Sequence, residues 1–204
     1  MSTLIDRVFG QKIKGVRVVP LVLKIVTIFT VLLLVSNFIS NYINLMLNRG
    51  EELKLGSQLL VKDLKELSIF AMNQYQIYQF NNDYKGAIES IKQSASKELT
   101  RPKSLALGMK VDGSVVFSAS QTLDVTHFTD QSALAMLEKA STSNTPEGSI
   151  LFTWNGNRFF GVYKYNDKWD MYLIRAEELG EFYADSWAIF RQTSYIIVAL
   201  TLVC

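Results

Sequence analysis

The chain has 204 residues, of which 49% are hydrophobic and 20% charged, and it contains one His and one Cys. A single Cys excludes an internal disulfide, and a lone His beside a lone Cys excludes zinc sites built from several such ligands. The formal net charge of +2 is too small to indicate nucleic-acid binding, although the charges are unevenly distributed along the chain.

The N-terminal part combines a basic leader with an apolar helix. Between positions 21 and 39 the only charged residue is Lys24, and a helix of that length extends about 28 Å, close to the roughly 30 Å core of a bilayer. We therefore predict a transmembrane helix at residues 21–43. Residues 1–20 carry one acidic side chain, Asp6, and four basic ones: Arg7, Lys12, Lys14 and Arg17. The positive-inside rule places this leader in the cytoplasm and the residues after the helix outside.

Two other interpretations of this segment stay open. A cleaved signal peptide is disfavoured, because the leader is long and residues 36–41 offer no small-x-small cleavage site. A buried helix of a soluble core is disfavoured too, because such helices rarely stay apolar around their whole circumference for five turns.

Residues 48–191 are predicted to form one extracytoplasmic domain that begins with two helices. The first helix, 51–80, is marked by an apolar stripe at helical spacing: Leu53, Leu60, Leu64, Leu67, Ala71, Tyr75 and Tyr78. No proline separates it from the first apolar segment, so the two are expected to form nearly one rod. Asn81-Asn82-Asp83 ends this helix, and a second one continues to Arg101-Pro102.

Alternating patterns then predict five strands. Residues 104–111 and 114–120 flank Asp112-Gly113, a strong hairpin signal. Thr129-Asp130 is expected to cap a short helix, and 141–148 reads as a loop. Three further strands are predicted at 149–154, 157–165 and 168–175, joined by turns at Asn155-Gly156 and Asn166-Asp167. This order of elements predicts an α+β fold with a mainly antiparallel sheet.

The end of the chain repeats the membrane signal in a shorter form. A last helix is predicted from about Glu177, and it runs into residues 192–204, whose last ten residues carry no charge. Ten residues do not cross a bilayer, so we expect 192–204 to be the start of a second transmembrane helix in a longer protein. The alternative is a short hydrophobic tail packed on the domain.

The two faces of the predicted sheet differ in character. If both last turns hold two residues, Phe152 lies opposite Phe159, and Tyr163 opposite Asp170. One face then gathers Ile150, Phe152, Trp154, Phe159, Gly161, Tyr163, Asp170, Tyr172 and Ile174. The other gathers Leu151, Phe160, Val162, Met171 and Leu173, with Arg158 and Lys164 among them. We expect the long helix to cover this second face.

The first face is the candidate ligand site, because a small polar ligand needs apolar walls, a few hydrogen-bonding groups and empty volume. The candidate binding residues are Trp154, Phe159, Gly161, Tyr163, Asp170 and Tyr172. Gly161 is expected to leave the volume, the two tyrosines to offer hydroxyls, and Asp170 to hold an ammonium group. The alternative is an aromatic sheet core with Asp170 and Lys168 at a solvated edge.

Nothing in the sequence indicates covalent chemistry. His127 follows Asp124 by three residues, but no nucleophile stands at a recognisable elbow, so a loop histidine is the preferred interpretation. The chain has no Walker-type glycine loop, no H-E-x-x-H and no G-x-S-x-G motif. We predict no catalytic residue, no metal and no cofactor in this segment.

The order of elements resembles the single Cache sensors of bacterial receptors. The resemblance covers about 48–191 and is carried by the anchor that runs into a long helix, the hairpin, and the ending NGNRFFGVY (155–163) followed by KWDMYLI (168–174). It implies a PAS-like sheet, a pocket for an amino acid, a carboxylate or a similar metabolite, and a homodimer through the long helix. Asp170 matches an acid on a late strand of the family.

The resemblance also implies a missing output domain after Cys204. A class III adenylate or guanylate cyclase is favoured, followed by a histidine kinase, a diguanylate cyclase or a chemotaxis signalling helix. The leading hypothesis is thus the sensing region of a multi-pass receptor of the bacterial cytoplasmic membrane. The competing hypothesis is a membrane-anchored scaffold without a small-molecule ligand, and an outer-domain enzyme ranks third.

Overall fold

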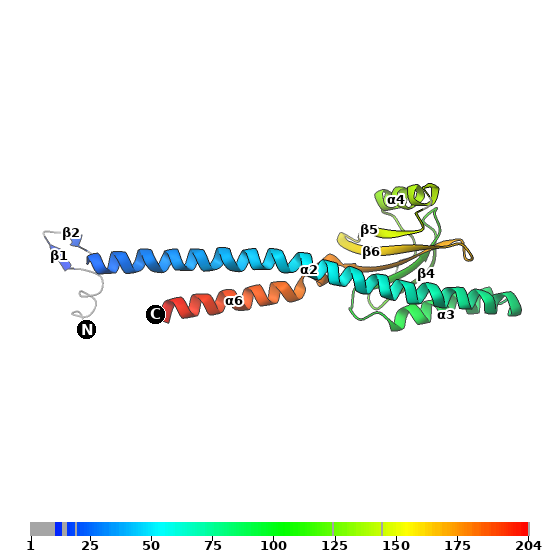
Figure 1. Ribbon diagram of the computed structural model, residues 1–204, viewed down its shortest axis with the longest axis horizontal. Helices are drawn as coiled ribbons and strands as arrows, with labels where there is room; N and C mark the ends of the chain where they lie inside the picture. The colour runs from blue at the N-terminus through cyan, green and yellow to red at the C-terminus, as the bar shows by residue number, and fades with distance from the viewer. Residues whose placement is uncertain (1–10, 14–15, 19, 124, 144, 204) are drawn as a thin grey trace. The chain divides into compact units, whose positions relative to one another are not determined.

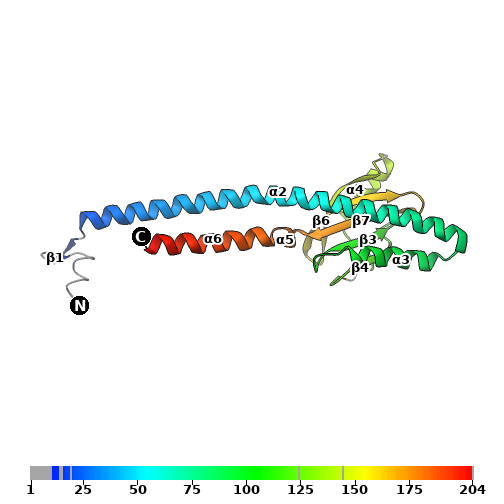
Figure 2. The same ribbon diagram turned by 60° about the horizontal axis from the view of Figure 1, so that its bottom comes forward.

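The computed structural model of the chain describes residues 11–13, 16–18, 20–123, 125–143 and 145–203. The chain divides into two compact units, one formed by the residues up to 49 and from 186 onward, the other by residues 50–185. Figures 1 and 2 show the elements of both units. Arg7 and Lys14 of the predicted basic leader lie outside the described residues.

The first unit contains the apolar parts of two helices. Strands β1 (Gln11–Ile13) and β2 (Val16–Val18) pair antiparallel, and α2 (Leu21–Asn81) follows. By length and composition, α2 is the one helix in the described part of the chain that qualifies as a membrane span. Within this unit the side-chain amide of Asn41 donates hydrogen bonds to Ser194 Oγ (3.0 Å) and Phe190 O (3.3 Å) of α6 (Ala184–Val203). The expected second span at 192–204 stays a prediction.

The second unit is built on a five-stranded antiparallel sheet with the strand order β4-β3-β7-β6-β5 (Figure 2). Its strands are β3 (Leu105–Met109), β4 (Val115–Ser120), β5 (Glu147–Trp154), β6 (Asn157–Asn166) and β7 (Met171–Glu178). Its helices, beside the second half of α2, are α3 (Tyr84–Lys97), α4 (Gln131–Thr142) and α5 (Leu179–Phe182). The predicted α+β fold with a long N-terminal helix and an antiparallel, PAS-like sheet is confirmed.

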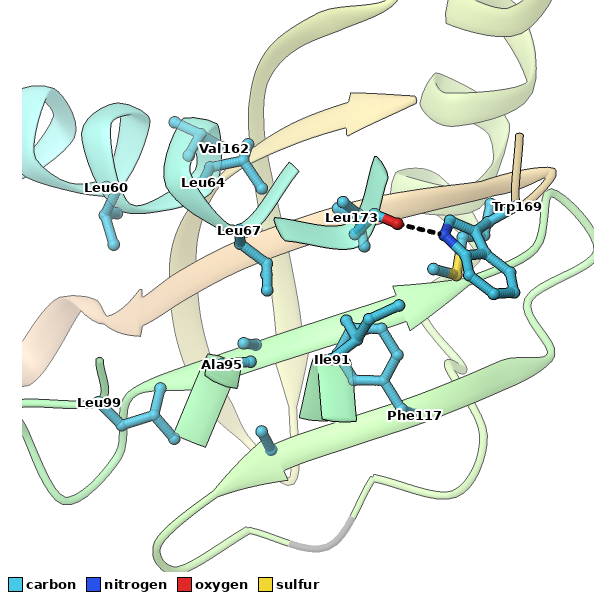
Figure 3. Close-up of a cluster of buried hydrophobic side chains, with 14 of the residues drawn as sticks. Leu60, Leu64, Leu67, Ile91, Ala95, Leu99, Phe117, Val162, Trp169 and Leu173 are labelled. Atoms are coloured by element: carbon cyan, nitrogen blue, oxygen red, sulfur yellow. Dashed lines mark hydrogen bonds between the residues drawn. The ribbon is translucent and has the colours of Figure 1, made fainter. Parts of the chain in front are cut away.

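The second half of α2 packs with α3 on one face of the sheet (Figure 3). The predicted stripe is the part that is buried: Leu60, Leu64, Leu67 and Ala71 are at most 5% exposed. Trp169 closes the far end of this layer, because its indole N–H donates to Ala71 O at 2.7 Å and its ring packs among Tyr75, Tyr78 and Tyr84. As predicted, the helix is continuous with the apolar segment, and it ends at Asn81.

Arg175 of β7 is the one charged side chain deep in this layer among the described residues, at 2% exposure. Its guanidinium donates to the carbonyl oxygens of Glu98 (2.7 Å) and Leu105 (3.4 Å) and lies 3.7 Å from Asp63 of α2. Arg175 therefore ties together the C-terminal end of α3, strand β3 and α2. Burial raises the pKa of Asp63, although the charge of Arg175 opposes this, and burial lowers the pKa of Arg175.

Helix α4 covers the other face of the sheet (Figure 1). As predicted, Asp130 caps it, and its carboxylate accepts from the N–H groups of Ser132 and Ala133. The same carboxylate also accepts from Thr153 N at 2.7 Å, which ties the start of α4 to β5. Phe128, Ala133, Leu137 and Ala140 are buried against the sheet.

The predicted register of the β5–β6 hairpin is confirmed, and the predicted register of the β6–β7 hairpin is wrong. Phe152 pairs with Phe159 across a two-residue turn, where Asn155 and Gly156 have φ of 48° and 78°, as a type I′ turn requires. Across the last turn, Tyr163 pairs with Ile174 instead of Asp170.

The physical reason is a longer turn between β6 and β7. The side-chain oxygen of Asn166 accepts from the N–H groups of Lys168 and Trp169, and Asp170 has φ of 49°. The loop thus carries Trp169 to its partner on α2 before β7 begins at Met171. The shift is by an even number of residues, so the residues of β7 keep their predicted faces. Lys168, Trp169 and Asp170, which were predicted to belong to this strand, lie in the turn instead.

Candidate functional site

The predicted aromatic face exists, and most of it is buried under α4. Phe159, Tyr163 and Tyr172 are at most 4% exposed and belong to one cluster with Ile150, Phe152 and Ile174. Phe152 stacks on Phe159 at 5.3 Å, and Tyr163 meets Tyr172 edge-on at 5.7 Å. Trp154 is half-buried at the edge of the same cluster. Gly161 lies between Phe159 and Tyr163 on β6, so this face brings together all of the six candidate residues except Asp170.

The hydroxyl of Tyr172 already has a partner inside the protein. It donates to Leu137 O of α4 at 3.0 Å, and burial raises the pKa of Tyr172. Because this bond closes α4 over the sheet, a ligand on the aromatic face needs α4 to move. The binding roles of these residues stay a prediction.

Gly161 serves close packing in this structure. A Cβ built there would lie 2.9 Å from Ala176 Cβ and 3.0 Å from Arg175 O on the neighbouring strand. Contacts this short force the backbone apart, so the small pair Gly161–Ala176 permits β6 and β7 to approach each other. The volume expected beside Gly161 is filled by the protein.

Asp170 lies in the β6–β7 turn, and its carboxylate binds a neighbouring side chain. Tyr165 donates its hydroxyl hydrogen to Asp170 Oδ1 at 2.6 Å, which together with burial raises the pKa of Tyr165 to about 12. Since the folded chain holds this proton more tightly, the resulting stabilisation is present below pH 10 and is lost as the pH rises through the folded pKa.

We expect Asp170→Asn to return the pKa of Tyr165 towards 10, because the variant removes the charge and keeps a residue that tolerates a positive φ. Ultraviolet titration of tyrosinate, compared between the variant and the parent chain, measures this shift. The variant Asp167→Asn in the same turn is the control, since the Asp167 charge is the last and smallest influence on Tyr165. Equal titration of all three proteins would contradict the assignment.

A groove lies on the opposite face of the sheet, between α2 and the β5–β6 hairpin. Its volume is about 490 Å³, within the range of small-molecule sites. It is lined by Ser57, Val61, Leu64, Lys65, Glu147, Gly148, Ser149, Val162, Tyr163 and Lys164. Tyr163 is the only predicted site residue among them.

The sequence signals for this groove were present but incomplete. The charged pairs Lys62-Asp63 and Lys65-Glu66 are typical of a solvated helix face, and Lys65 is exposed accordingly. The β5–β6 register correctly places Lys164 on the face that α2 covers. Sequence alone did not show that α2 leaves the β5 edge of this face uncovered.

The described residues contain no group of three or more His, Cys, Asp and Glu side chains that could hold a metal ion. His127 is an exposed loop residue whose ring Nδ1 lies 3.2 Å from Thr126 O. Its sequence neighbour Asp124 lies outside the described residues.

Comparisons with known proteins give similarity to solved structures and no match in sequence. No family model matches the chain, and a search of curated proteins finds no significant match. Among the solved structures, a Cache chemosensory domain that recognises carboxylic acids is similar, with 12% identity, a TM-score of 0.42, and coverage of 63% of this chain and 97% of that domain. At this identity and TM-score, the similarity assigns neither a ligand nor site residues to this chain.

Proposed function

We propose that the chain is the sensing region of a bacterial membrane receptor, whose outer domain binds a small molecule and passes the event to a separate output domain. One observation carries the proposal: the single helix α2 holds both the apolar stretch and the stripe that packs on the sheet. The central strand β7 leads through α5 into the second apolar helix, α6. Both connections from the sheet towards the membrane are therefore continuous in the chain.

The end of β7 offers a means of relay, because it is fastened to both α2 and the α3–β3 loop. Phe182 of α5 packs on Gly56 of α2. Two carboxylates at the end of β7, both 8% exposed, pair with basic residues of the α3–β3 loop, Glu177 with Arg101 (3.2 Å) and Glu178 with Lys103 (2.6 Å). A ligand that favours one arrangement of these contacts over another would shift the position of the exit helix.

The remaining parts of the proposal concern the membrane and the partners. The basic leader favours a cytoplasmic N-terminus and an extracytoplasmic sheet domain. Labelling in intact cells tests this, with Ser96→Cys or Lys12→Cys introduced into a Cys204→Ser background. A membrane-impermeant maleimide should react with the cysteine at the exposed position 96 and not with the cysteine at position 12. The reverse pattern would contradict the proposed topology.

The family resemblance supports a homodimer and, as output, a nucleotide cyclase before a histidine kinase, a diguanylate cyclase or a chemotaxis signalling domain. The ligand classes it supports are amino acids, carboxylates and similar metabolites. These assignments are part of the proposal, and assays for each of these output activities distinguish among them.

A scaffold function is the second candidate, and one observation favours it. The aromatic face is filled by α4, as a domain without a ligand on that face would be.

Thermal unfolding of the whole chain in nanodiscs, measured across a library of amino acids and carboxylates, separates the two functions. A sensor should gain about 2.7 kcal/mol of stability at one hundred times its dissociation constant. Indifference to the entire library would favour the scaffold.

A further inference from the structure

The groove between α2 and the β5–β6 hairpin has a helical wall and a strand floor of defined chemistry. Ser57, Val61, Leu64 and Lys65 lie on one side of α2, at spacings that place them on adjacent turns. On the hairpin, Glu147 pairs with Lys164 and Ser149 with Val162, so these four side chains share one face. Leu64 and Val162 are at most 4% exposed and form an apolar floor.

The charges of the groove do not cancel. Lys164 Nζ lies 3.0 Å from Glu147 Oε2, which leaves that pair close to neutral. Lys65 makes no ion pair with any residue that the structure describes, whereas its helix neighbour Lys62 is paired with Glu66 at 3.8 Å. Two ammonium groups therefore face one carboxylate, and the groove carries a net positive charge above an apolar floor.

Two of the hairpin residues that line the groove are small. Glu147, Gly148 and Ser149 are the β5 residues that line it, and the last two have small side chains. A Cβ at position 148 would come within 2.7 Å of the Tyr163 hydroxyl oxygen, so the glycine makes room for that hydroxyl beside the groove. Ser57 and Ser149 add hydroxyl groups to a lining of apolar and charged side chains, whereas the Tyr163 side chain belongs to the aromatic cluster on the other face of the sheet.

We propose that this groove binds a small organic anion, with Lys65 and Lys164 holding the charged group. The floor of Leu64 and Val162, together with the more exposed Val61, would hold a short apolar body. The inference rests on the proposed sensor function and adds the location and the charge class of the ligand. Because the groove joins α2 to the hairpin, an occupant contacts the helix that continues into the apolar segment.

Butanoate is a suitable probe, with 1-butanol and butylamine as neutral and cationic controls of the same length. Calorimetry on the whole chain in nanodiscs should detect heat of binding for butanoate and none for the other two. Lys65→Gln and Lys164→Gln should each weaken butanoate binding about tenfold or more, because each removes a charge-assisted contact. Lys62→Gln, on the same helix and outside the groove, should leave binding unchanged.

A second variant avoids any change of charge. Ser149→Leu fills the floor at an exposed strand position and should abolish butanoate binding without lowering the melting temperature. Butylamine binding as well as butanoate, or full affinity in both Lys65→Gln and Ser149→Leu, would overturn the assignment.

The experiments distinguish a wrong assignment of the ligand to the groove from a wrong assignment of the sensor function. Butanoate binding that survives the groove variants but is lost in Tyr172→Phe would place the ligand on the aromatic face and leave the sensor function standing. If butanoate does not bind, only the proposal that the groove binds an organic anion is overturned, since the metabolite library tests the sensor function independently. If the groove instead accommodates a second copy of the chain, Ser149→Leu should change the sedimentation of the protein and butanoate should not bind.

Discussion

Arg175→Ala is expected to lower the free energy of unfolding by about 3–5 kcal/mol, the cost of removing one partner from a buried ion pair. The substitution leaves Asp63 without its nearest cation and the carbonyls of Glu98 and Leu105 without their donor. It also leaves a void where a 2% exposed side chain stood. Chemical denaturation of the detergent-solubilised chain measures the loss.

Two further variants separate the charge from the void. Arg175→Met combined with Asp63→Leu removes both charges and keeps the volume, so it should recover a large part of the loss. Arg158→Ala, at an exposed position on the adjacent strand β6, should change stability by less than about 0.5 kcal/mol. An Arg175→Ala protein as stable as the parent would show that Arg175 does not hold the three elements together.

Gly56→Ala and Gly50→Ala are expected to change stability in opposite directions, although both residues lie inside α2. At position 56 a Cβ would overlap the Phe182 ring, which is 3% exposed and packed against Phe160 and Arg101. Overpacking costs about 1–3 kcal/mol and exceeds the gain of about 1 kcal/mol from replacing a helical glycine by alanine. At position 50 no atom lies within 4 Å, so only the gain remains.

Thermal and denaturant unfolding of the two single variants measure this difference. Gly56→Ala combined with Phe182→Ala is the control, since it removes the overlap and should unfold no more easily than Phe182→Ala alone. Stabilisation by Gly56→Ala would mean that the Phe182 ring moves freely, and the proposed relay through this contact would then lose its support.

The sequence predicted the elements of the fold well where a repeating pattern decided them. The stripe from Leu60 to Ala71 and the type I′ turn at Asn155-Gly156 are local signals, and both are confirmed. The length of the β6–β7 turn was predicted wrongly, because it depends on the hydrogen bond from Trp169 to Ala71 O, a partner 98 residues away. No local pattern carries that information.

The candidate site was harder to predict than the fold for a related reason. Aromatic residues on one strand face indicate a cluster, but the same residues form either a pocket wall or a filled core, and only the position of α4 decides between the two. The pattern of charges around Asp63 is typical of solvated helix surface, yet Asp63 lies one residue from Leu64 of the buried stripe and 3.7 Å from Arg175. Its position beside the apolar stripe was the signal in the sequence that Asp63 is partly buried.

The central place of β7 in the sheet has a consequence for the order in which this domain assembles. The hairpins β3–β4 and β5–β6 join near neighbours in the chain, whereas β3 meets β7 through pairs such as Leu105 with Ala176. Contacts so distant in sequence form slowly. Until the ribosome has released β7, one edge of each hairpin therefore has backbone N–H and C=O groups without a partner strand. Nascent chains that stop before Met171 should therefore depend on chaperones, and those that extend beyond Glu178 should not.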